Sequence, residues 1–221
     1  MSAKGSRLMA QQSISGLYAI TPDEPDTARL LSLARLALQG GASVLQYRSK
    51  SDNYALKLEQ AKALAALARE FSVPLIINDD AELAMQAGAE GVHLGFEDGS
   101  VAAARRLLGA DKIIGVSCYN RLSLAHDAKR QGADYVAFGA FFVSTTKPQA
   151  AVAGPDLLSQ AKREVGLPIV AIGGITAENG ASLLNAGADA LAVISALFDA
   201  QDVMLSARQF ANLNLDRKDA T

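Results

Sequence analysis

Hydrophobic and polar positions alternate along this chain in two kinds of segment. Short runs rich in Val, Ile and Leu are separated by longer segments rich in Ala, Leu, Lys, Arg and Glu. This pattern is typical of parallel strands joined by crossover helices, and eight such pairs can be counted. It predicts strands near Leu17–Thr21, Ser43–Tyr47, Pro74–Asn78, Gly91–Leu94, Lys112–Ser117, Tyr135–Phe138, Pro168–Gly173 and Ala190–Ile194.

A short internal repeat supports the count of eight strands. Gly-Ala followed by Ser, Glu or Asp occurs at residues 41–43, 88–90, 132–134 and 187–189, each time between a predicted helix and an even-numbered strand. Glycine suits a left-handed helix C-cap because it has no Cβ to clash. Four copies, one for every two strand–helix units, favour a closed (β/α)8 TIM barrel over an open sheet.

The barrel is expected to form a single domain. Residues 16–212 are assigned to it, with a flexible N-terminus at 1–15 and a flexible C-terminal tail at 213–221. Asp26 is a candidate N-cap of the first helix. The segment from Val143 to Gly154 lacks clear periodicity, so it is the longest candidate loop and a candidate lid over the site.

Composition and charge narrow the classes of function. The formal net charge of -2 gives no basic surface that would favour nucleic acid. Cys118 is the single cysteine, so neither an internal disulfide nor a cysteine-based zinc site can form. The chain shows neither a signal-peptide pattern nor an apolar run of membrane-spanning length. We therefore expect a cytoplasmic protein that does not contact the membrane.

A basic motif follows the second predicted strand. In Gln46-Tyr47-Arg48-Ser49-Lys50, the period-2 alternation of a strand places Gln46, Arg48 and Lys50 on one side. An Arg fork and a Lys point charge are complementary phosphate ligands, and Gln46 is free to orient a neutral part of a substrate. The plainer alternative is a solvated strand end with surface charges.

Carboxylates follow the next two predicted strands. Asn78 and Asp79 end one of them, and Glu97 and Asp98 follow the other. Two carboxylates from neighbouring loops are suitable Mg²⁺ ligands beside a phosphate. The alternatives are helix N-capping by Asp79 and a helix N-terminal charge pair at Glu97 and Asp98.

The last three strand ends supply further anion-binding candidates. Ser144, Thr146 and Lys147 follow the sixth strand, where Lys147 adds positive charge on the rim opposite Lys50. Glycines after strand seven, and Ile194 and Ser195 after strand eight, occupy the loops that commonly bind phosphate in such barrels. They predict a second anion site, for a monophosphate.

Three residues near the strands have smaller roles. His93 is expected to be a hydrogen-bonded core histidine rather than a base. Cys118 is expected to be a small hydrophobic residue, and Ser117, at the end of strand five, is a candidate for a hydrogen bond to substrate.

Together these motifs resemble the thiamine phosphate synthase family from about Gly16 to Phe198. The resemblance implies an enzyme that joins 4-amino-5-hydroxymethyl-2-methylpyrimidine diphosphate to 4-methyl-5-(2-phosphoethyl)thiazole and releases pyrophosphate. It implies catalytic roles for Arg48, Lys50, Ser117 and Lys147, and Mg²⁺ binding by Asp79 and Asp98. The implied contacts to the pyrimidine diphosphate are Gln46, Arg48, Lys50, Asn78, Ser117 and Lys147, and those to the thiazole phosphate are Ser144, Thr146, Gly174, Ile194 and Ser195.

The chain departs from the family pattern at Phe96, at Tyr119 and at Val143-Ser144, which affects the shape of the pyrimidine pocket. Two alternatives stay open. A thiazole tautomerase of the same superfamily would lack the full diphosphate and metal set, and a non-catalytic barrel would bind a phosphometabolite without turnover. Association into a homo-oligomer also stays open.

Overall fold

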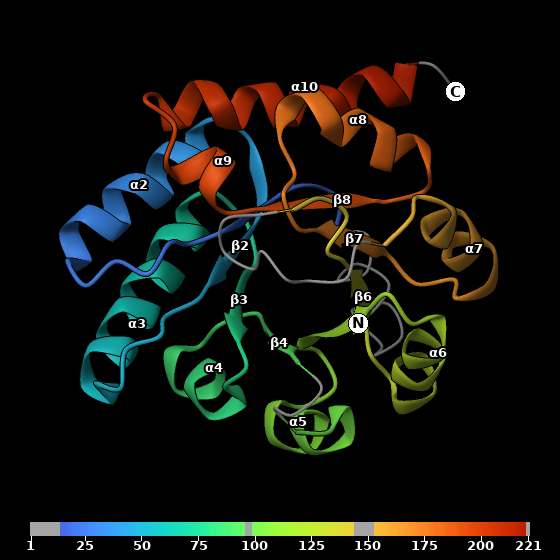
Figure 1. The fold of residues 1–221 in the computed structure, drawn as a ribbon. Helices are drawn as coiled ribbons and strands as arrows, with labels where there is room; N and C mark the ends of the chain where they lie inside the picture. The colour runs from blue at the N-terminus through green and yellow to red at the C-terminus, as the bar shows by residue number, and fades with distance from the viewer. Residues whose placement is uncertain (1–13, 96–98, 144–152, 220–221) are drawn as a thin grey trace.

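The computed structural model describes residues 14–95, 99–143 and 153–219, with the side chains of residues 214–219 left undescribed. Its eight strands form a closed barrel in which each strand pairs in parallel with the next one in sequence, and β8 pairs with β1 (Figure 1). The predicted (β/α)8 TIM barrel is confirmed.

The strands lie where the hydrophobic runs placed them, with ends that differ by at most two residues. Their bounds are β1 Gly16–Ile20, β2 Ala42–Tyr47, β3 Leu75–Asn78, β4 Gly91–Leu94, β5 Ile113–Tyr119, β6 Tyr135–Phe138, β7 Ile169–Ile172 and β8 Ala190–Val193.

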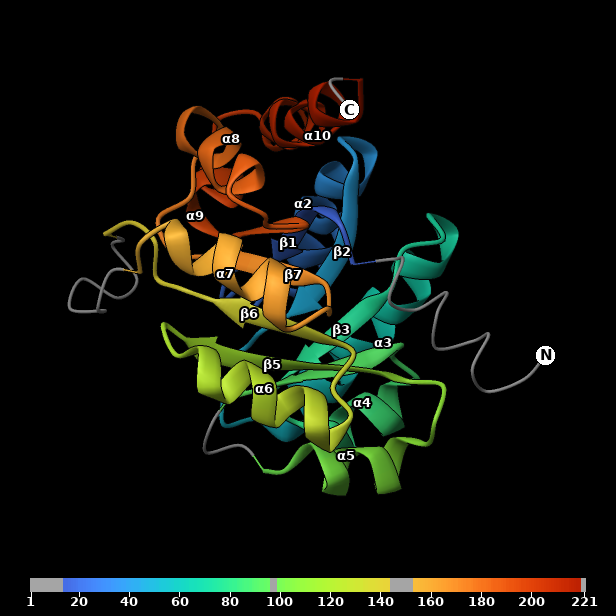
Figure 2. The ribbon, with the colours of Figure 1, turned by 90° about the vertical axis from the view of Figure 1, so that its right-hand side faces the viewer.

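Helices surround the barrel on its outside, as the end-on and side views show (Figures 1 and 2). They are α2 Thr27–Gln39, α3 Tyr54–Glu70, α4 Ala81–Ala87, α5 Val101–Leu108, α6 Leu122–Gln131, α7 Asp156–Glu164, α8 Ala177–Asn185, α9 Ser195–Phe198 and α10 Val203–Asp219. Helix α10 packs against α2, α8 and β1. It continues beyond residue 212, where the sequence pattern predicted the start of a tail. No helix in the described part of the chain is long and apolar enough to cross a membrane.

Two hydrophobic clusters hold these layers together. The larger lies between the strands and the helices, and the smaller fills the barrel interior. The interior cluster takes alternate residues of the strands, as the period-2 geometry requires: Tyr18, Ile20, Val44, Ile76, Ile113, Tyr135, Ala137, Val170, Ala190 and Ala192, with Ile14.

The Gly-Ala repeat has a structural role at the N-terminal end of the barrel. All four of its glycines have positive φ, between 67° and 119°. In three copies the acidic residue that follows accepts a hydrogen bond from the backbone N–H of a preceding strand residue. These bonds are Leu75 to Glu90, Ile114 to Asp134 and Ile169 to Asp189, each 2.9 Å.

A basic side chain accompanies each of these carboxylates. Arg69, Arg105 and Lys162 form ion pairs with Glu90, Asp134 and Asp189 respectively. In the first copy the repeat carries Ser43, whose hydroxyl donates to the carbonyl of Leu17. The repeat therefore joins neighbouring strands by side-chain hydrogen bonds at the barrel base.

Candidate functional site

The carboxyl ends of the strands open into a cavity of about 720 Å³. This volume falls within the range of small-molecule sites, and the position is the one where TIM barrels place their chemistry. Eight of the residues predicted from the sequence line the cavity: Gln46, Arg48, Asn78, Asp79, Ser117, Gly174, Ile194 and Ser195. Residues from strand ends far apart in sequence are thus brought to one place.

Arg48 supplies positive charge to this cavity. It is the single Lys or Arg among the described lining residues. Its backbone N–H donates to Thr21 Oγ1 at 3.0 Å, and the Thr21 hydroxyl contacts the Arg48 carbonyl at 3.4 Å. Thr21 is buried at the end of β1, so these bonds fix the backbone of Arg48.

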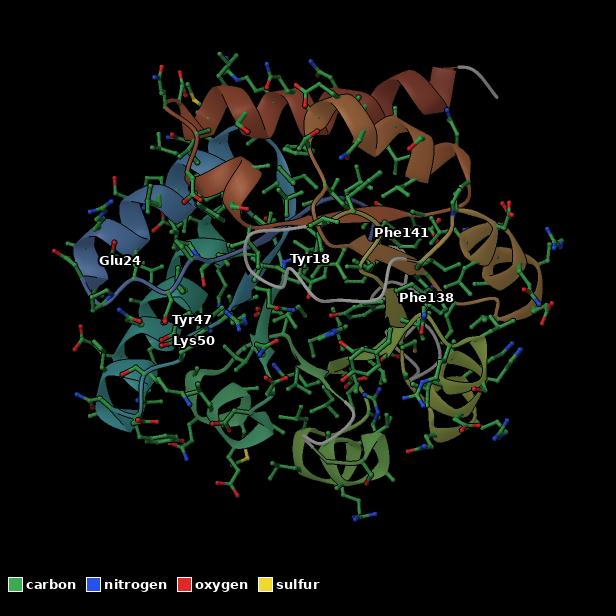
Figure 3. The ribbon with its side chains drawn as sticks, viewed as in Figure 1. Tyr18, Glu24, Tyr47, Lys50, Phe138 and Phe141 are labelled. Atoms are coloured by element: carbon green, nitrogen blue, oxygen red, sulfur yellow. The ribbon has the colours of Figure 1, made fainter. Side chains whose placement is uncertain are left out.

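Lys50 does not line the cavity. Its side chain is exposed, and its backbone N–H donates to Asp23 Oδ1 at 3.0 Å. Figure 3 labels it beside Tyr47 on the α3 side, apart from Tyr18 in the barrel interior. The alternation that was expected to carry Lys50 to the same side as Arg48 stops with the strand, because β2 ends at Tyr47.

Asp79 supplies negative charge, and it is the single Asp or Glu among the described lining residues. It is not the N-cap of α4, since Asp80 Oδ1 accepts the hydrogen bond from Leu83 N at 2.8 Å. Asp79 instead has a left-handed backbone with φ of 65°, which costs a non-glycine residue about 1 kcal/mol or more. Its backbone N–H donates to the His93 carbonyl at 2.7 Å, and Asn78 Nδ2 donates to its carboxylate.

Several predicted residues lie outside the described part of the chain. They are Phe96, Glu97 and Asp98 after β4, and Ser144, Thr146 and Lys147 after β6. Their roles stay predictions. Within the described residues, no group of three or more His, Cys, Asp and Glu side chains could hold a metal ion.

The loops after β7 and β8 form one wall of the cavity. Gly173 and Gly174 have φ of 103° and 64°, and a Cβ on Gly174 would lie 2.6 Å from the carbonyl oxygen of Val143. Only glycine allows this close approach of two backbones. Asn179 holds the loop in place, because its side chain accepts from Thr176 N at 2.9 Å and donates to the Gly174 carbonyl at 3.0 Å.

The floor of the cavity includes two residues that the sequence interpretation did not single out, Tyr18 and Tyr135. The Tyr135 hydroxyl lies 2.7 Å from that of Tyr18 and 2.9 Å from His93 Nδ1, and His93 Nε2 lies 2.9 Å from Ser117 Oγ. His93 is thus hydrogen-bonded at both ring nitrogens, as predicted, although it also lines the cavity.

One feature of the sequence, Gly115, indicates that a large side chain such as Tyr135 enters the barrel interior. Gly115 stands in the middle of β5, where a Cβ would lie 2.0 Å from Tyr135 Cζ. Glycine inside a strand often marks the close approach of another group. Here it leaves room for the Tyr135 ring to cross the barrel interior.

Tyr119 and Val143, two of the departures from the family pattern, line the cavity near its opening. Tyr119 has a left-handed φ of 52° and is 44% exposed. The guanidinium of Arg121 lies over its ring at 5.9 Å. These two positions therefore contribute to the shape of the opening.

Burial keeps the two phenols of the cavity floor and the Cys118 thiol of the larger hydrophobic cluster protonated. Desolvation raises the pKa of Tyr18 and Tyr135, and it raises the pKa of the Cys118 thiol to about 12. Cys118 is fully buried and is therefore not a nucleophile at neutral pH.

Comparisons with known proteins identify the family. The sequence model of the family described as Thiamine monophosphate synthase matches residues 17–197. The chain belongs to this family. Thiamine-phosphate synthase from Methylobacillus flagellatus is 58% identical over 90% of this chain and 95% of its own length. The corresponding protein from Thiobacillus denitrificans is 56% identical, over 90% of this chain and 94% of its own length.

The solved structures agree with the sequence relatives. Thiamine phosphate pyrophosphorylase from Pyrococcus furiosus superimposes with a TM-score of 0.84 at 32% identity, over 94% of this chain and 98% of its own. The 3-hexulose-6-phosphate synthase from Salmonella typhimurium, with a TM-score of 0.67 at 19% identity, shares the fold. As a member of the thiamine monophosphate synthase family, the chain is an enzyme, a transferase that acts on small molecules.

Proposed function

We propose that the cavity at the carboxyl end of the barrel joins the pyrimidine diphosphate to the thiazole phosphate, forming thiamine phosphate and releasing pyrophosphate. The observation that carries this proposal is that eight predicted contact residues from separate strand ends line one cavity. The family match over residues 17–197 supports it independently of the geometry.

The pyrimidine diphosphate is proposed to lie on the side of β2, β3 and β5. Gln46 and Ser117 contact the pyrimidine part, and Arg48 and Asn78 contact the diphosphate. Arg48 can bind phosphate oxygens in a bidentate manner. One cation holds a diphosphate poorly, so Lys147 and Lys50 are proposed to add charge at the rim.

The thiazole phosphate is proposed to lie against the loops after β7 and β8. Glycine backbone N–H groups near Gly174, with Ile194 and Ser195, surround its phosphate, and Ser144 and Thr146 are proposed to complete the site. The left-handed glycines and the Asn179 bonds already fix this wall of the cavity. Such a preformed wall lowers the ordering cost of binding.

The proposed reaction does not require a strong base. The C–O bond between the pyrimidine methylene and the diphosphate breaks, and the diphosphate leaves with the electron pair. The lone pair of the thiazole nitrogen then forms the new C–N bond to the methylene carbon. Catalysis is therefore stabilisation of the leaving group together with positioning of two substrates.

A Mg²⁺ ion is part of the proposal, with Asp79 and Asp98 as the residues that would hold it. Asp79 fits this role because its carboxylate lines the cavity and does not cap α4. Carboxylate oxygens with water and phosphate oxygens are the donor set that Mg²⁺ prefers. When bound, the ion would neutralise negative charge on the diphosphate.

The test is product formation by the purified protein. Thiamine phosphate and pyrophosphate are measured with Mg²⁺ and both substrates, and then with each component omitted in turn. The proposal expects product only in the complete mixture. Thiazole phosphate binding without product under any mixture would favour the tautomerase or the non-catalytic barrel.

A further inference from the structure

Five polar side chains from five strands form one continuous hydrogen-bonded chain across the floor of the cavity. Gln46 Nε2 donates to the Tyr18 hydroxyl at 2.8 Å, and the bonds from Tyr18 through Tyr135 and His93 to Ser117 follow at 2.7, 2.9 and 2.9 Å. The two ends of this chain, Gln46 and Ser117, are the residues proposed above to contact the pyrimidine.

The middle of the chain is closed to solvent. Tyr18 and Tyr135 are 1% and 0% exposed, and Gln46 and His93 are also buried. Both phenols have a raised pKa because burial disfavours the phenolate, so each hydroxyl keeps its single proton. A protonated hydroxyl donates one hydrogen bond, and a neutral imidazole donates from one nitrogen and accepts at the other.

With a neutral His93, these proton counts link the directions of all four hydrogen bonds, so that they reverse only together. When Gln46 donates to Tyr18, the Tyr18 proton points to Tyr135 and the Tyr135 proton points to His93 Nδ1. His93 Nε2 then donates to Ser117, which leaves the Ser117 proton for the cavity. The Gln46 amide oxygen is likewise left for the cavity as an acceptor. Reversing any one bond forces the others to reverse, because an unpaired buried polar group is costly.

Gly115 leaves the space that the Tyr135 side chain of this hydrogen-bonded chain occupies. A Cβ at this position would lie 2.0 Å from Cζ and 2.4 Å from the hydroxyl of Tyr135. The Tyr135 ring also stacks on the His93 ring, with centroids 5.5 Å apart and an interplanar angle of 27°. The Tyr135 hydroxyl is therefore held between its two partners.

We propose that Tyr18, Tyr135 and His93 are positioning residues that determine specificity for an aminopyrimidine. They link Gln46 to Ser117, and in the direction in which Gln46 Nε2 donates to Tyr18 they present a Gln46 acceptor to the exocyclic amino group and a Ser117 donor to an acceptor on the same substrate. In this direction an oxo group in place of the amino group faces another acceptor at Gln46, and a hydrogen bond to it requires every bond of the chain to reverse. This inference rests on the proposed function, since it takes the pyrimidine diphosphate as the ligand.

The test is calorimetric binding of the aminopyrimidine diphosphate and its oxo analogue to the wild type and to Tyr135→Phe. The substitution keeps the ring and removes the central hydroxyl. We expect the preference for the amino compound to narrow by about tenfold, because the two buried hydrogen bonds of the Tyr135 hydroxyl no longer link Gln46 to Ser117. The KM for the thiazole phosphate should stay within about twofold of the wild-type value in the turnover assay.

Tyr47→Phe is the matched control. The Tyr47 hydroxyl is also buried and donates to Gln60 Oε1 at 2.7 Å, but it belongs to the outer hydrophobic cluster. This variant should keep the amino preference even where its melting temperature falls as far as that of Tyr135→Phe. Tyr18→Phe interrupts the chain at its other phenol and replaces Tyr135→Phe if that protein does not fold.

The possible results of these binding and turnover measurements distinguish a failure of the positioning role from a failure of the proposed reaction. An amino preference unchanged in a folded Tyr135→Phe or Tyr18→Phe protein overturns the positioning role, even if the wild type makes thiamine phosphate. A wild type that makes no product but binds the aminopyrimidine, with a preference lost on Tyr135→Phe, overturns the reaction and keeps the positioning role. A wild type that binds neither pyrimidine overturns both.

Discussion

The two ends of this barrel use the same kinds of charged side chain in opposite ways. At the N-terminal end, Asp134 is 1% exposed and binds both the backbone of Ile114 and the side chain of Arg105. At the carboxyl end, Arg48 and Asp79 face a cavity of about 720 Å³. The charges at the base bind the backbone and side chains of the protein itself, whereas the charges at the mouth line the cavity.

This difference separates stability from function along one axis of the molecule. In TIM barrels generally, residues at the N-terminal face support the fold and those at the strand carboxyl ends carry the chemistry. The hydrogen-bonded floor from Gln46 to Ser117 lies between these two regions. Its middle members are buried, all five are hydrogen-bonded in sequence, and its two ends, Gln46 and Ser117, line the cavity.

The largest expected effect is at the mouth. Arg48→Met keeps much of the side-chain volume and removes the charge, so kcat/KM should fall by about 10²-fold or more, as for other groups that stabilise developing negative charge. The melting temperature should stay within about 2 °C of the wild type, since the fold does not need this guanidinium.

Arg69→Met is the matched control for Arg48→Met, because Arg69 pairs with Glu90 at the base. It should leave turnover unchanged. Pyrophosphate release measures both variants, and equal losses of activity in the two would remove the distinction between the ends of the barrel.

The next largest effect is expected at the base. Asp134→Asn should lower the free energy of unfolding by about 2 to 3 kcal/mol, because a buried charge-assisted hydrogen bond to Arg105 is lost. Turnover per folded molecule should be unchanged. Urea unfolding measures the first quantity and the substrate assay the second.

Asp127→Asn provides the comparison for Asp134→Asn. Asp127 pairs with Arg130 on the exposed surface of α6, and such pairs contribute at most about 0.5 kcal/mol. A similar loss of stability in both variants would argue against a special role for the repeat.

The sequence predicted the fold well because the barrel depends on patterns that are local and periodic. Apolar runs and the Gly-Ala repeat located the strands to within two residues. The residues at strand ends were predicted as a set because parallel strands place their ends together. Arg48 and Ser117 could therefore be predicted as site residues without any knowledge of long-range contacts.

Other features depended on geometry that no local pattern contains. Tyr18 and Tyr135 are 117 positions apart, and their contact follows from the barrel register and from the space left by Gly115. The choice of Asp80 over Asp79 as the cap of α4 follows from backbone dihedral angles. The prediction for Lys50 assumed that the alternation of strand β2 continued to residue 50, but β2 ends at Tyr47.

Lys50 offers a smaller test within the mouth itself. Because its side chain is exposed and does not line the cavity, Lys50→Ala should lower kcat/KM by less than about tenfold, and the effect should shrink as salt is raised. A loss as large as that of Arg48→Met, independent of salt, would show that Lys50 reaches the diphosphate directly. Initial rates at two ionic strengths measure this.

The smallest expected effect concerns Cys118. Burial raises the pKa of its thiol to about 12, so the thiol stays protonated up to about pH 9 in the folded enzyme. Iodoacetamide should therefore leave the native protein unlabelled at pH 8 and label it fully in urea. Rapid labelling of the native protein would show that the larger hydrophobic cluster around Cys118, between the strands and the helices, opens to solvent.

The most direct test of the account is a crystal structure of the enzyme with thiamine phosphate, pyrophosphate and Mg²⁺. We expect pyrophosphate beside Arg48 and Asp79, the pyrimidine ring between Gln46 and Ser117, and the thiazole phosphate against Gly174 and Ser195. Products bound elsewhere, or a pyrimidine that contacts neither Gln46 nor Ser117, would contradict it.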